Sequence, residues 1–283
     1  MLKLDIDCST SLESQLDRLA LESNFVTNLV DSFKSIIPDL AVKLVDSSDH
    51  FKANLFDKPR IKEIRAAYDN VKNVYQHADF MNYRSMLVSV PEGFKGNFQA
   101  YLQMLCKLSP TVYKEANAFI AEYNFVLADF LTNKEAKKCN ISHDVVYRKI
   151  TASREANVKE IEHYFTAKSD SSKARLGDVV GRFNELVNLS NGAIELEKNQ
   201  SISNLQDLAD GIAKSIYYLN IIKQNLEEDK ISEVCGVTAA SISNGAYEVA
   251  KYVEFVSIFR FKCEQATAAV ENTLITVHKA IQG

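Results

Sequence analysis

Residues 245–283 read GAYEVAKYVEFVSIFRFKCEQATAAVENTLITVHKAIQG, with no proline and with glycine only at the two ends. Apolar residues and one threonine return every three or four positions from Val249 to Ile281, with Arg260 as the one exception. That spacing places them on one face of an α-helix. A continuous helix of roughly 36 residues would be about 54 Å long, whereas a compact chain of this size is only about 40 Å across. The stretch therefore predicts an elongated bundle of long helices.

The same spacing recurs through most of the remaining chain and predicts further helices. We expect helices over residues 10–37, 39–45, 61–78, 97–107, 110–130, 142–167, 176–190 and 201–226, besides the last one. Proline cannot continue a helix without losing a hydrogen bond, so we expect one helix to end before Pro38 and another to begin at Pro110. Asn191 and Gly192 are expected to end the helix that precedes them.

Residues 2–6 alternate between apolar and charged positions, which is typical of a short half-buried strand. Residues 86–90, ahead of Pro91, are a second candidate strand, and we expect the two to pair. The predicted fold class is therefore all-α: an elongated multi-helix bundle with long antiparallel helices and at most one small two-stranded β element. All four prolines lie in the first 110 residues. This predicts a region of shorter helices over residues 1–108 and a long-helix bundle over residues 109–283, within one continuous domain.

The composition excludes several classes of protein. With 46% apolar and 25% charged residues, the chain is neither disordered nor collagen-like. The net charge of −4 gives no basis for nucleic-acid binding, which needs a basic surface. Five scattered cysteines and a beginning without an apolar signal region favour a reducing compartment, either the cytoplasm or a virion, and no secretion through a signal peptide.

Residues 234–247 are the longest stretch without a charged residue. They are shorter than the about 20 apolar residues that a spanning helix needs. We therefore expect no constitutive membrane insertion. The stretch is the one candidate for a membrane-active hairpin, and the alternative is a simple connecting segment.

No residue pattern predicts a catalytic, cofactor-binding or metal site. Glu160 and His163 form a single Glu-x-x-His pair, whereas a di-iron site in a helical bundle needs two. Cys139 and His143 are four residues apart, but a thiol nucleophile needs a base and an orienting group, and neither is identifiable. We therefore expect no cofactor, and these residues are interpreted as structural.

Two glycine pairs have structural interpretations as well. Gly93 and Gly96 are typical of a turn between a strand and a helix. Gly177-x-x-x-Gly181 favours close packing of two helices, either inside the bundle or with another chain.

Some apolar residues lie on a predicted helix but outside its main apolar face, and others lie on the predicted strands. A helix that is apolar on more than one face is buried on more than one face, and a two-stranded sheet leaves open edges. Such residues either sit centrally in the bundle or meet a partner. The candidate interaction surface consists of Leu4, Ile6, Val88, Val90, Tyr217, Phe255 and Phe259.

Long helices without a recognisable reactive site favour a non-enzymatic structural or assembly protein. We expect it to act with protein partners as a subunit of a larger homo- or hetero-oligomer, for example as a viral (bacteriophage) particle component. One alternative is a membrane-acting α-helical bundle that forms pores or remodels membranes. A second alternative is an enzyme with an unrecognised metal or thiol site.

Overall fold

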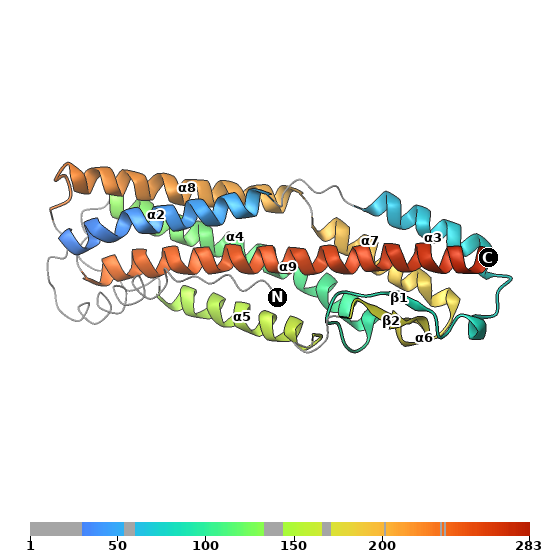
Figure 1. Cartoon of the computed structure of the whole chain (residues 1–283). Helices are drawn as coiled ribbons and strands as arrows, with labels where there is room; N and C mark the ends of the chain where they lie inside the picture. The colour runs from blue at the N-terminus through green and yellow to red at the C-terminus, as the bar shows by residue number, and fades with distance from the viewer. Residues whose placement is uncertain are drawn as a thin grey trace. The chain divides into compact units, whose positions relative to one another are not determined.

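The computed structural model describes residues 30–53, 60–132, 144–165, 171–200, 202–232, 234 and 236–283. These residues form eight α-helices and a two-stranded antiparallel sheet (Figure 1). The helices are α2 (Val30–Ala53), α3 (Ile61–Tyr75), α4 (Phe98–Thr132), α5 (Asp144–Glu162), α6 (Leu176–Val179), α7 (Leu186–Asn199), α8 (Ile202–Glu227) and α9 (Gly236–Gln282). The strands are β1 (Leu87–Ser89) and β2 (Lys173–Arg175). The predicted all-α multi-helix fold is confirmed.

The chain divides into two compact units. Unit 1 contains Met1–Ala53, Glu115–Ser153 and Gln206–Glu254, and unit 2 contains Asn54–Lys114, Arg154–Leu205 and Phe255–Gly283. Helices α4, α5, α8 and α9 contribute residues to both units. The distribution of prolines predicts a boundary between two regions at residue 108, but this residue lies inside α4.

In unit 1, aromatic rings and a tyrosine hydroxyl connect helices α4 and α9. Phe119 of α4 stacks on Tyr252 of α9 with ring centroids 5.2 Å apart. The Tyr123 hydroxyl, one turn further along α4, donates to the carbonyl oxygen of Ile242 at 3.0 Å. Because residue numbers rise on α4 while they fall on α9, these two helices are antiparallel in unit 1. All of these aromatic rings are buried, so they fill the space between the two helices.

Unit 2 has an aromatic core where the segment before α4 meets the end of α5. Phe94 lies against Phe98 and Tyr101, with ring centroids 5.4 Å away in both cases. Tyr164 and Phe165 complete the cluster, at 5.2 Å and 5.5 Å from the Tyr101 ring. Aromatic rings in edge-on and tilted contacts stabilise a core by more than the burial of their apolar area alone would give.

The sheet pairs Leu87 with Arg175 and Ser89 with Lys173. The strand predicted at residues 86–90 is therefore present, but its partner is β2, whereas residues 2–6 lie outside the described residues. The outer edge of β1 is occupied, because the Thr273 hydroxyl of α9 donates to the Ser89 carbonyl oxygen at 3.0 Å. Another strand cannot pair with β1 at that position.

The predicted helix breaks at two prolines are wrong. Pro38 lies inside α2 and Pro110 lies inside α4. A proline inside a helix costs about 3 kcal/mol, but apolar side chains within one turn on both sides are buried, which offsets that cost. These neighbours are Ile37, Leu40, Leu108 and Val112.

Two other expected helix ends are also misplaced. Helix α7 continues past Asn191 and Gly192, where a Cβ added at Gly192 would lie 3.8 Å from Leu102 Cβ. The glycine therefore marks a close approach of α7 to α4 rather than a helix end. Helix α9 begins at Gly236, so most of residues 234–247 form its first turns rather than a hairpin. Among the helices that the structure describes, none combines the length and apolarity needed to cross a membrane.

Candidate binding surfaces

The residues proposed from the sequence as an interaction surface are divided between the core and the surface. Val88 and Val90 are buried at the sheet, and Phe255 and Phe259 are buried on α9. Tyr217 is 61% exposed on α8. Leu4 and Ile6 lie outside the described residues. Four of the seven therefore contribute to the core of unit 2, and Tyr217 alone among the described ones is on the surface.

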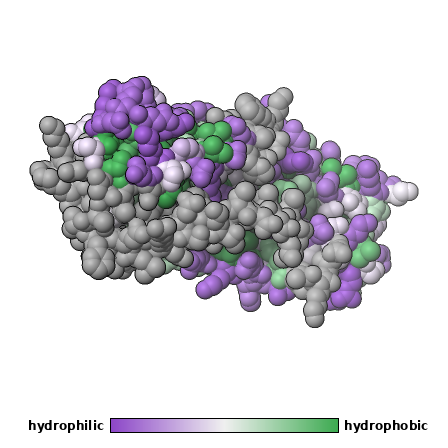
Figure 2. Space-filling view, turned by 60° about the vertical axis from the view of Figure 1, so that its left-hand side comes forward, coloured by the Kyte–Doolittle hydropathy of each residue, from purple (hydrophilic) through white to green (hydrophobic). Residues whose placement is uncertain are grey.

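Large apolar side chains are exposed at other positions, and in Figure 2 such apolar residues appear among hydrophilic ones. Two of them belong to the sheet region of unit 2: Met81 is 64% exposed and Leu87 is 56% exposed. Met81 is part of a single 3₁₀ turn, Phe80–Asn82, which Asp79 caps by accepting the Met81 N–H at 3.0 Å. A capped turn and a paired strand hold the backbone that carries these two side chains in place.

Cations surround these two apolar residues. Leu87 lies directly opposite Arg175 across the sheet, and Lys173 is exposed two residues before Arg175, on the same face of β2. Arg84 lies against Gly177, and it lines a hollow of about 280 Å³ together with Met81, Ser85, Arg175, Gly177 and Asp178. We call Met81, Arg84, Leu87, Lys173 and Arg175 the basic face.

The basic face carries more positive than negative charge. Arg175 Nε lies 2.9 Å from Asp178 Oδ2, and this hydrogen bond raises the pKa of Arg175, so the guanidinium stays charged. Arg84 and Lys173 are exposed and form no ion pair within the described part of the chain. Three cations therefore share two neighbouring carboxylates, Asp178 and Asp79, of which Asp79 Oδ1 lies 3.0 Å from the Met81 nitrogen.

Unit 1 carries an outward surface of the opposite sign on α2. Val42 is 58% exposed and Val45 is 39% exposed. Asp39, Asp46 and Asp49 are exposed beside them and form no ion pair within the described residues. These five residues fall on the side of α2 away from its buried stripe, and we call them the acidic face.

Two of the three lysines of α2 contact other groups. Lys34 Nζ lies 4.0 Å from Asp229, and Lys43 Nζ lies 4.1 Å from the centre of the Tyr247 ring. Neither of these two lysines therefore neutralises the acidic face.

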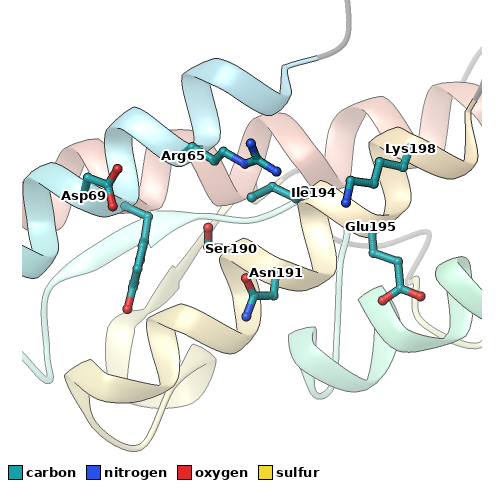
Figure 3. Close-up of a pocket in the computed structure, with 8 residues that line it drawn as sticks. Arg65, Asp69, Ser190, Asn191, Ile194, Glu195 and Lys198 are labelled. Atoms are coloured by element: carbon teal, nitrogen blue, oxygen red, sulfur yellow. The ribbon is translucent and has the colours of Figure 1, made fainter.

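A larger hollow, of about 500 Å³, lies between α3 and α7 in unit 2. Arg65, Tyr68 and Asp69 line it from α3, and Ser190, Asn191, Ile194, Glu195 and Lys198 line it from α7. Figure 3 shows that the Glu195 side chain points away from Arg65. The two cations and two carboxylates balance in charge and do not converge on a common point, so this hollow has no evident preference for a charged ligand.

The thiols of unit 2 are poorly suited to nucleophilic chemistry. Burial raises the pKa of Cys106 to about 11, with the Glu195 carboxylate adding to the effect. Burial also raises the pKa of Cys263 well above its ordinary value. A thiol reacts as the thiolate, so both remain protonated near neutral pH.

The other residues singled out in the sequence do not form a reactive cluster within the described residues. Glu160 and His163 are exposed, and His163 contacts the Tyr164 ring edge-on. Cys139 and His143 lie outside the described residues. No group of three or more potential metal ligands occurs in the described residues.

The glycine pairs also have local roles. Gly93 and Gly96 have φ values of 71° and 95°, which fit the predicted turn. The interpretation of Gly177 and Gly181 as a helix-packing motif is wrong, because α6 ends at Val179. The Gly181 N–H instead donates to Glu185 Oε2 at 2.8 Å, and this bond lowers the pKa of Glu185.

The basic face cannot be recognised from the sequence. The only local signal is the Lys-Ala-Arg alternation of residues 173–175, which is typical of a strand with one charged side. Met81 and Arg84 lie about 90 residues earlier, and only the sheet pairing brings them to the same surface. No family model matches the chain, and neither does any curated protein or solved structure.

Proposed function

We propose that the chain is a structural or assembly protein that acts as a subunit of a larger protein complex, such as a virus particle. The observation that supports this function is the basic face, where Met81 and Leu87 are exposed beside Arg84 and Lys173, which form no ion pair with the residues that the structure describes. Exposed apolar side chains with a rim of polar and charged residues are typical of a surface that binds another protein.

The backbone that carries Met81 and Leu87 is also consistent with this function. The face is formed by a capped turn and by paired strands, of which β1 is fixed to α9 through Thr273. A surface held in one conformation before binding loses less conformational entropy when a partner binds. The basic face is therefore suited to repeated, specific contacts.

The function is tested by measuring the mass of the purified chain in solution over a wide concentration range and identifying chains that co-purify from the source cells. We expect an oligomer or a stable complex. The variant Met81→Ser with Leu87→Ser should shift the mass toward the monomer. Ile258→Ser, at an exposed apolar position on α9, is the matched control. A chain that stays monomeric at every concentration and co-purifies with no other chain would contradict the proposed function.

A further inference from the structure

We infer that the partner of the basic face is the acidic face of a second copy of this chain. This inference rests on the proposed function and specifies one of its contacts. The two faces are complementary in charge, because one presents Arg84, Lys173 and Arg175 and the other presents three aspartates. Burying oppositely charged surfaces against each other steers association and sets its register.

The apolar side chains of the two faces also match. Val42 and Val45 lie among the aspartates of α2, and Met81 and Leu87 lie among the cations of the sheet region. Contact between the faces would remove both apolar pairs from water, which stabilises association in proportion to the area buried. The charges alone would give a weak, salt-screened attraction, so the apolar pairs supply much of the affinity.

The geometry of this contact is heterologous. The basic face belongs to unit 2 and the acidic face to unit 1, so each copy offers a different surface to each of two neighbours. A contact of this kind adds copies one after another and ends either in a closed ring or in an open filament. The chain would therefore form assemblies of many copies rather than a simple dimer.

Charge reversal tests the inference on the full chain. The basic-reversed variant carries Arg84→Glu and Lys173→Glu, and the acidic-reversed variant carries Asp39→Lys and Asp46→Lys. All four positions are exposed, and circular dichroism checks that the variants fold as the wild type does. Each variant alone places like charges across the contact, so we expect its association constant to fall at least tenfold. Added salt should weaken the wild-type association.

Recombining the variants separates this contact from others. In an equimolar mixture, every contact between a basic-reversed and an acidic-reversed copy again joins opposite charges. Sedimentation velocity should therefore show assemblies in the mixture, and also for a chain that carries all four substitutions. Association that survives single reversal, or that is not restored in the mixture, would overturn the inference while leaving the proposed function intact. A wild type that stays monomeric would overturn it as well. Binding of the wild type, but not of the basic-reversed variant, to vesicles of anionic lipid without self-association would assign the basic face to a membrane surface instead.

Discussion

The Tyr123 hydroxyl on α4 donates a hydrogen bond to the carbonyl oxygen of Ile242 on α9, across 3.0 Å in the interior of unit 1. Tyr123 is fully buried, and so is Ile242. This contact ties the first turns of α9 to α4 in the core of unit 1.

Replacing Tyr123 with Phe removes that hydrogen bond and keeps the ring. We expect a loss of about 1 kcal/mol in the free energy of unfolding, because a buried hydrogen bond contributes about that much. Urea denaturation followed by circular dichroism measures it. Tyr217→Phe, at an exposed tyrosine, is the control and should leave stability unchanged. Equal midpoints for the two variants would show that the hydroxyl contributes nothing to stability.

Gly211 and Gly192 both lie inside helices, but the structure predicts that alanine changes stability in opposite directions at the two positions. A Cβ at Gly211 of α8 would lie 2.8 Å from Ile120 Cγ2, whereas a Cβ at Gly192 of α7 would meet nothing closer than 3.8 Å. Alanine favours the helix by about 1 kcal/mol at both sites. At Gly211 the overpacking costs about 1–3 kcal/mol and outweighs that gain.

We therefore expect Gly192→Ala to stabilise the chain and Gly211→Ala to destabilise it. The urea midpoints of the two variants, compared with that of the wild type, measure the difference. A stabilised Gly211→Ala variant would show that α4 and α8 approach less closely than the structure indicates.

The helical stripes were predictable because their spacing is a local property of the sequence. Ile61 to Tyr75 and Ile202 to Glu227 correspond closely to the predicted helices. The errors at Pro38 and Pro110 have a different origin, since the penalty of a proline is local but the burial that offsets it is tertiary. No pattern in one segment shows how much surface its neighbours will cover.

The surface was less predictable than the helices for the same reason. Phe255, Phe259 and Tyr217 are all aromatic residues of long helices that the sequence assigns to a candidate interaction surface, yet only Tyr217 is exposed. The partner of β1 was missed because β2 is a three-residue strand with two charged side chains, which does not resemble a strand from its hydrophobicity. Residues that assemble from distant segments, such as Arg84 and Arg175, share a surface only after the sheet has formed.

Aspartate at two core positions should unfold the chain. Leu219 of α8 and Val256 of α9 are completely buried, in unit 1 and unit 2 respectively. An unpaired buried charge costs several kcal/mol, so each variant should lose more than about 4 kcal/mol of stability. Thermal melting measures the loss. Tyr217→Asp and Ile258→Asp, at exposed neighbouring positions, should melt near the wild-type temperature. Normal melting of the core variants would mean that these faces are not part of a core.

The raised pKa of Cys106, about 11, predicts slow alkylation. At pH 8 its thiolate fraction is about two orders of magnitude below that of an exposed thiol. The folded state holds this proton more tightly than the unfolded state, so stability should fall as the pH rises from about 8.5 toward 11. A variant with serine at Cys8, Cys139 and Cys235 isolates the reaction of Cys106, because Cys263 is buried. Iodoacetamide labelling as rapid as that in urea would contradict the prediction.

Gly177→Ala tests the basic face without changing its charge. A Cβ at Gly177 would lie 2.9 Å from Arg84 Nε and closer still to Arg84 Cγ, which is near the base of the side chain, so the whole Arg84 side chain must change its rotamer. We expect a folded variant, checked by circular dichroism, with a weaker association constant, measured by sedimentation velocity. Gly181→Ala is the matched control, because its Cβ would meet Glu185 Oε2 at an ordinary 3.4 Å. If the two variants associate equally well, the position of Arg84 has no part in the contact between copies.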